Sequence, residues 1–134
     1  MIKTILIIKP SALGDIVLAL PALSALRKHF PDARIDWMIR PEFSKLLEGH
    51  PHINQLIYFD RSSLKGFWKN PNAFFLLIDL IKQLRKKRYD VVFDFQGLFR
   101  TAALSWLSGC KKRIGMANAR EGAGLFYNVR VKPD

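Results

Sequence analysis

Short apolar runs alternate along the chain with longer segments in which apolar residues recur at helical spacing. The run Thr4–Ile8 is rich in isoleucine and uninterrupted, as expected for a strand buried on both faces. In residues 34–40, Ile35, Trp37 and Ile39 alternate with Asp36 and Met38, which predicts a second strand. Further strands are predicted at residues 55–59, 91–95, 113–114 and 127–131.

Four segments are predicted as helices, at residues 21–30, 41–48, 73–88 and 98–107. Pro21 suits the first turn of a helix, so we expect a short turn at residues 15–20 before it. In the helix at 73–88, which has the clearest pattern, an apolar stripe comprises Phe74, Leu77, Ile78, Ile81 and Leu84. Residues 60–72 are predicted to be a polar, basic and aromatic connection.

This alternation predicts one α/β domain with a parallel sheet and helices on both faces. Ligands of such sheets bind beyond the carboxyl ends of the strands. We therefore expect the loops at residues 10–15, 60–72 and 94–97 to lie at the binding edge.

Charge adds a preference for an anionic partner. The chain of 134 residues has 22 Lys and Arg against 11 Asp and Glu, a net charge of +11. Nucleic acid, acidic lipid headgroups and phosphorylated sugars all fit this charge. The single cysteine, Cys110, favours a reducing compartment, and no apolar run is long enough for a transmembrane helix or a secretory signal. The expected location is the cytoplasm.

The loop after the first strand ends in Gly14-Asp15 at an expected helix start. Asp15 fits two roles, a helix cap or a general base that deprotonates a substrate hydroxyl. The complete glycine pattern of dinucleotide-binding folds is absent, which argues against a nicotinamide-dependent dehydrogenase.

Three other segments carry candidate chemistry. Asp94 and Gln96 follow the strand at 91–95, where they fit either hydrogen bonding to a sugar or a turn and helix cap. A basic and aromatic set fits phosphate recognition or a solvated loop; it comprises Arg61, Lys65, Lys69 and Arg100, with Phe67 and Trp68. Arg120 beside Glu121 fits a local ion pair or an anion contact. The histidines lack the spacing of a metal site.

Several of these segments, in this order, resemble the ADP-heptose:lipopolysaccharide heptosyltransferases of glycosyltransferase family 9. They are Ile5–Val17, Leu20–Leu23, Ile35–Trp37, Tyr89–Leu98, Ala119–Glu121 and Leu125–Asn128. The details are most similar to the type I branch, with types II and III as alternatives. A basic nucleic-acid-binding module is the alternative from another class, although no helix-turn-helix, zinc-finger or RNP signature is present.

The resemblance implies a Rossmann-like three-layer domain with a mostly parallel sheet, the N-terminal half of a GT-B glycosyltransferase. Residues 1–134 would be the acceptor-binding domain, and the C-terminal donor-binding domain would be absent, so we expect this chain alone to be inactive. The reaction would use ADP-heptose as donor, would invert the anomeric centre, and would need neither a metal nor a cofactor.

The same resemblance implies roles for individual residues. Asp15 would be the catalytic base. Substrate binding would involve Ser11, Gly14, Arg61, Lys65 and Arg120, to which the place of Gln96 after the strand at 91–95 adds Gln96. The partners would be a lipid A–Kdo acceptor and the anionic inner face of the cytoplasmic membrane, where the enzyme would be peripheral. Nucleic acid would not be a partner, and the isolated fragment could self-associate.

Overall fold

The computed structural model describes residues 2–96, 98–116 and 129–131. Six parallel strands form one sheet in the order β3-β2-β1-β4-β5-β6. The strands are β1 (Thr4–Ile8), β2 (Arg34–Ile39), β3 (Gln55–Tyr58), β4 (Val91–Asp94), β5 (Arg113–Met116) and β6 (Val129–Val131). The predicted parallel α/β architecture is confirmed.

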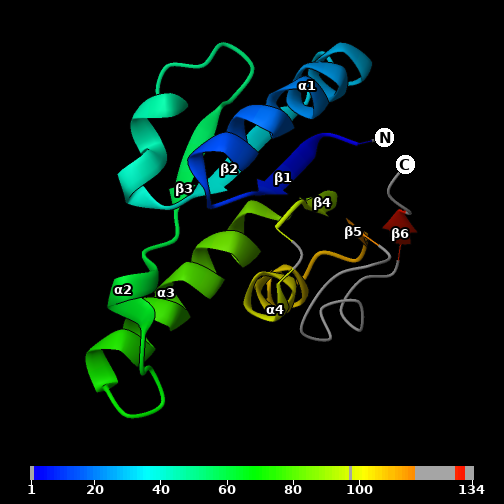
Figure 1. Cartoon of the computed structure of the whole chain (residues 1–134). Helices are drawn as coiled ribbons and strands as arrows, with labels where there is room; N and C mark the ends of the chain where they lie inside the picture. Colours follow the sequence, from blue (N-terminus) through cyan, green and yellow to red (C-terminus); the bar gives the residue numbers. More distant parts are fainter. Residues whose placement is uncertain (1, 97, 117–128, 132–134) are drawn as a thin grey trace.

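Helices cover both faces of this sheet, which gives three layers (Figure 1). Helix α1 (Leu13–His29) packs on one face, over a core that includes Ile5, Ile35 and Trp37. Helices α3 (Pro71–Lys87) and α4 (Phe99–Leu107) pack on the other. The shorter elements are the 3-10 helix η1 (Pro41–Leu46), within the predicted helix at 41–48, and α2 (Arg61–Leu64), within the predicted connection at 60–72.

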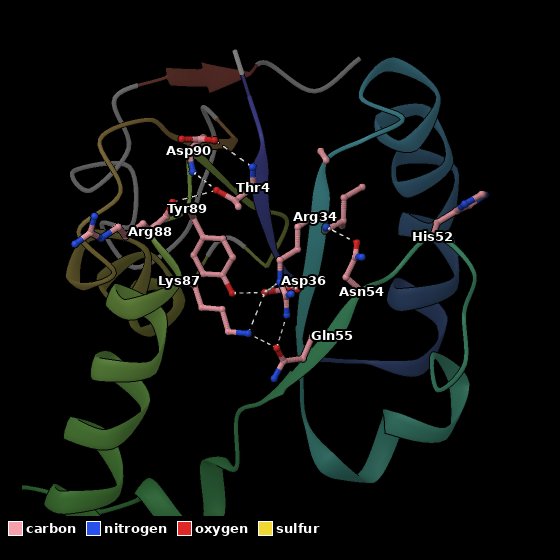
Figure 2. A network of polar contacts seen from close by, with 12 residues as sticks. Thr4, Arg34, Asp36, His52, Asn54, Gln55, Lys87, Arg88, Tyr89 and Asp90 are labelled. Atoms are coloured by element: carbon pink, nitrogen blue, oxygen red, sulfur yellow. Dashed lines mark hydrogen bonds and ion pairs between the residues drawn. The ribbon is translucent and has the colours of Figure 1, made fainter.

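The alternation in β2 does not mark an exposed face. Asp36 and Met38 are as fully buried as Ile35 and Trp37, because β2 is an inner strand and a helix layer covers each face of the sheet. Met38 enters the core beneath α3. Asp36 is part of a polar network on that same face (Figure 2).

Helix α1 differs from the prediction, because the expected turn at residues 15–20 is helical. The helix begins at Leu13 and continues through Pro21. Ile16 and Leu23, one on each side of the proline, are completely buried in the same core. Burying two such side chains stabilises the fold by about 1.5–3 kcal/mol each, which offsets the cost of a mid-helix proline, about 3 kcal/mol.

The buried side of α3 agrees with the predicted stripe in part: Leu84 is buried, and Leu77 and Ile81 pack against the core. Its buried residues are Ala73, Leu80 and Leu84, whereas Phe74 is 45% exposed. The helix has 17 residues and β4 has four, so their lengths are about 25 Å and 13 Å. The first turns of α3 therefore extend past the carboxyl edge of the sheet, where none of the described strands lies beneath them.

The strand order places a topological switch point between β1 and β4. From β1 the chain continues outward to β2 and β3, and then returns to β4 on the other side of β1. The loops that follow β1 and β4 consequently diverge, and such a divergence is where ligands bind in open parallel sheets.

Candidate functional site

The loops after β1 and β4 are joined by the side chain of Gln96. Lys9 Nζ donates a hydrogen bond to Gln96 Oε1 at 3.1 Å, and Gln96 Nε2 donates to Ser11 Oγ at 3.5 Å. Two residues predicted to bind substrate, Ser11 and Gln96, thus lie side by side at the switch point.

Asp94 has a structural role at the start of the second loop. It is buried, and its Oδ1 accepts a hydrogen bond from the backbone N–H of Gln96 at 2.9 Å. Of the two roles predicted for Asp94, this hydrogen bond supports the turn. Gln96 is only partly buried and directs its amide group toward the first loop.

Asp15 is exposed in the first turn of α1. The helix cap is Ala12, and no side chain caps this end, so the capping alternative for Asp15 is wrong. Its carboxylate hydrogen-bonds to no residue in the described part of the chain. The positive end of the helix dipole favours a negative charge at this position. Asp15 therefore presents an exposed carboxylate beside the switch point that accepts no hydrogen bond from the described residues.

Gly14 precedes Asp15 in the same turn. A Cβ atom added to Gly14 would meet no atom within 4 Å among the residues described. Packing within this part of the chain therefore does not require glycine at position 14. Its lack of a side chain leaves the surface beside Asp15 open to a ligand.

Lys9 is a buried cation that we did not single out from the sequence. Burial lowers the pKa of Lys9, and the nearby Asp15 and Asp94 carboxylates counter part of that effect. The backbone carbonyl of Lys9 accepts a hydrogen bond from Trp37 Nε1 at 3.1 Å, which anchors the loop to β2. A lysine directly after a strand buried on both faces was the signal that could have identified it.

A groove of about 670 Å³ lies on the α3–α4 face, next to the carboxyl edge of the sheet. Its lining combines an apolar floor with cations and aromatic rings: Arg40, Phe59, Leu64, Lys65, Gly66, Phe67, Trp68, Leu77, Arg100, Ala103, Leu104 and Leu107. Lys65 and Arg100 thus share one cavity. Lys69 lies outside this lining.

Arg40 is a second cation that we did not single out from the sequence, and it lines the groove. It follows β2 directly, so the parallel topology carries it to the same edge as the loops after β1 and β4. Its guanidinium pairs with Glu42 at 2.9 Å and lies 6.0 Å from the centre of the Phe43 ring.

The predicted site residues therefore separate into two neighbouring regions at one edge. Ser11, Gly14, Asp15 and Gln96 surround the switch point, and Lys65 lies in the groove. The helix that contains Arg61 is described but the side chain of Arg61 is not, and Arg120 lies outside the described residues. Within the described ranges, no group of three or more His, Cys, Asp or Glu residues could hold a metal ion. None of the described helices is both long and apolar enough to cross a membrane.

Comparison with known proteins gives consistent matches. The profile described as glycosyltransferase family 9 (heptosyltransferase) matches residues 77–134. The lipopolysaccharide core heptosyltransferase OpsX of Haemophilus influenzae is 29% identical over 97% of this chain, which covers 35% of that protein. Lipopolysaccharide heptosyltransferase 1 of Escherichia coli is 30% identical over 92% of this chain, covering 40% of that protein. The chain thus spans about two fifths of the length of these relatives.

Solved structures agree with the sequence matches. The E. coli heptosyltransferase WaaC with ADP-2-deoxy-2-fluoro heptose superposes with a TM-score of 0.85 at 30% identity, over 96% of this chain and 42% of that one. A family 9 glycosyl transferase from Veillonella parvula gives a TM-score of 0.81 at 26% identity, over 98% of this chain and 36% of that one. The fold is that of the N-terminal part of GT-B heptosyltransferases. The chain belongs to glycosyltransferase family 9, the heptosyltransferases, and corresponds to the N-terminal part of its members.

Proposed function

We propose that this chain is the acceptor-binding and base-carrying domain of an inverting glycosyltransferase. The enzyme transfers heptose from ADP-heptose to the Kdo-containing inner core of lipopolysaccharide, and a donor-binding domain supplies most of the contacts to ADP-heptose. The exposed Asp15 carboxylate beside the switch point, free of hydrogen bonds to the described residues, is the observation that carries the proposal.

Asp15 acts as the general base in one displacement. An acceptor hydroxyl gives its proton to the Asp15 carboxylate while its oxygen forms a bond to the anomeric carbon of heptose. The bond from that carbon to the diphosphate breaks on the opposite face, and ADP leaves with the electron pair. Attack from the face opposite the leaving group inverts the anomeric centre, and a single base suffices for this step.

The other residues hold the acceptor against Asp15. Ser11 and Gln96 supply hydroxyl and amide groups for sugar hydrogen bonds, and Gly14 allows close approach. Lys65 offers a charge to the acidic groups of the acceptor, as we also propose for Arg61 and Arg120. Lys9 places its ammonium group between the two loops and fixes the orientation of the Gln96 amide.

The acceptor is lipid-linked, so we place the enzyme at the inner face of the cytoplasmic membrane as a peripheral protein. The relatives include lipopolysaccharide heptosyltransferases 1 and 3 at similar identity, 30% and 32%. Assays of the full-length protein on Kdo₂-lipid A and on a heptosylated acceptor would separate type I activity from types II and III.

The test of the base is Asp15→Asn in the full-length protein that contains this chain. The amide cannot take up the proton, so we expect kcat to fall about 10²–10⁴-fold, while acceptor affinity measured by calorimetry changes little. Asp32→Asn, an exposed carboxylate after the far end of α1, is the matched control and should keep full turnover. Unchanged turnover in Asp15→Asn would show that another group is the base. Residues 1–134 alone should give no turnover, because the donor contacts are supplied by the other domain.

A further inference from the structure

We propose that the tip formed by residues 65–76, between α2 and the second turn of α3, inserts its apolar side chains into the headgroup region of an anionic membrane. This inference rests on the proposed function only in that a lipid-linked acceptor requires an enzyme at a membrane. The evidence for the tip itself is the exposure, position and charge of its side chains.

The tip exposes large apolar side chains at a density found on no other segment of comparable length in the described part of the chain. Trp68 is 71% exposed, Phe75 is 63% exposed and Leu76 is 48% exposed. Phe67 and Phe74 are also exposed. Phe67 and Trp68 contact each other, as do Phe74 and Phe75, and large exposed apolar side chains gathered on one segment of a folded domain are typical of an interaction site.

The position of the tip allows insertion without disturbing the core. Ala73 packs inward and is buried, so α3 is anchored at its first turn. Asn70 caps the helix, and its Oδ1 accepts the backbone N–H of Asn72 at 3.0 Å. Figure 1 shows the chain between α2 and α3 projecting away from the sheet, on the side toward which the strands point. The large apolar side chains on this overhang are exposed to solvent.

The positive charge of the tip favours an anionic lipid surface as its partner. Residues 61–78 contain three basic residues and no Asp or Glu. Lys65 and Lys69 are exposed beside the aromatic rings. Aromatic and leucine side chains flanked by lysines match a membrane interface, where rings enter the headgroup layer and ammonium groups meet lipid phosphates.

The tip also adjoins the candidate site. Phe67 and Trp68 line the groove that contains Lys65 and Arg100. A membrane that receives this tip would lie against the open end of the groove, so a lipid-linked substrate could enter the groove without leaving the bilayer.

Vesicle binding with two leucine variants tests the proposal. Leu76→Ser removes an exposed leucine from the tip, and Leu18→Ser removes one that is 79% exposed on α1, across the sheet. On vesicles of equal parts phosphatidylglycerol and phosphatidylethanolamine, Leu76→Ser should weaken binding about tenfold. Leu18→Ser should bind like the unmodified chain, and circular dichroism checks that both variants fold. Equal binding by the two variants would overturn the proposal.

Trp68 reports insertion directly. In a Trp106→Phe background the remaining tryptophans are Trp68 and the fully buried Trp37. Emission should shift to the blue when anionic vesicles are added, and brominated lipids should quench it. Vesicles of phosphatidylcholine should give a weaker shift, and added salt should reduce binding. A blue shift that instead follows protein concentration without lipid would identify the tip as a self-association surface and refute membrane insertion. The vesicle experiments contain neither donor nor acceptor. A failure to bind vesicles would therefore leave the transferase proposal standing, and a failure of the transferase test would leave membrane insertion by the tip standing.

Discussion

Asp36 is a fully buried carboxylate at the centre of a polar network (Figure 2). Tyr89 donates its hydroxyl to Asp36 Oδ2 at 2.7 Å, Arg34 Nε lies 3.2 Å from Oδ1, and Lys87 Nζ lies 3.9 Å from Oδ2. Burial and this hydrogen bond, in that order, raise the pKa of Tyr89. The network joins β2 to the end of α3 and the start of β4.

Replacing Asp36 by Ala leaves the buried Tyr89 hydroxyl without its acceptor and removes the carboxylate that both cations pair with. We expect a loss of about 2–4 kcal/mol in the free energy of unfolding, below the largest effects of buried pairs because Arg34 and Lys87 are partly exposed. Urea denaturation measures this. Asp32→Ala removes an exposed carboxylate and should cost far less, and equal losses would contradict a special role for the network.

The hydrogen bonds to Asp90 predict that the free energy of unfolding falls at acidic pH. The backbone N–H groups of Lys3 and Thr4 donate to Asp90 Oδ2 at 2.7 and 3.1 Å, and these bonds hold the pKa of Asp90 below its ordinary value. A depressed carboxyl pKa adds stability that is present above the unfolded pKa, about 4, and is lost as the pH falls through the folded pKa.

Asp90→Asn should therefore lower Tm at neutral pH, and the difference from the unmodified chain should shrink as the pH falls below about 4. Thermal melts at a series of pH values measure this. Asp79→Asn, an exposed position on α3, should show no such convergence. A constant difference for Asp90→Asn would show that its charge is not what these bonds stabilise.

At the scale of elements, local patterns predicted the strands well because β1, β3 and β4 are short, mostly apolar runs and β2 alternates, as expected in a sheet covered by helices. They failed where packing decides the outcome. Pro21 suggested a helix start, but the burial of Ile16 carries α1 through it. Phe74 continued the helical period of α3, but it lies on the overhang, where there is no sheet to cover it.

The candidate site, like the elements, could be predicted only in part. The sequence alone predicts that Ser11 and Gln96 lie at the same edge of the sheet, because each follows a strand of a parallel sheet. The contact between them, with Lys9, depends on rotamers and on the adjacency of β1 and β4, which a single sequence does not encode locally. Arg40 was missed because its role comes from topology and not from a motif.

The prediction at the scale of elements concerns Pro21 and the stability of α1. It is exposed within α1, so an alanine there needs no repacking. Pro21→Ala restores a backbone donor toward Val17 and removes the ring clash, and we expect a gain of about 1–2 kcal/mol after the loss of the proline's restriction of the unfolded chain. Thermal denaturation measures it. A lower Tm would mean that the helix requires the bend that a proline imposes.

At the scale of the whole molecule, the net charge of +11 and the placement of single cations have separable effects. A long-range field attracts any polyanion and depends on the total charge, whereas a binding site depends on where each charge lies. Lys65, in the groove, and Lys28, in the last turn of α1 beyond the opposite edge of the sheet, are both exposed lysines. Their replacement by glutamine lowers the net charge by the same single unit.

If the groove binds the acidic acceptor, Lys65→Gln should weaken binding of a water-soluble Kdo-bearing acceptor by about 3–10-fold, as expected for one charged hydrogen bond. Lys28→Gln should change it much less, and raising the salt concentration should weaken the binding of both variants through the shared field. Calorimetric titration at two salt concentrations measures both effects. Equal losses at low salt would mean that the field alone attracts the acceptor and that the groove is not where it binds.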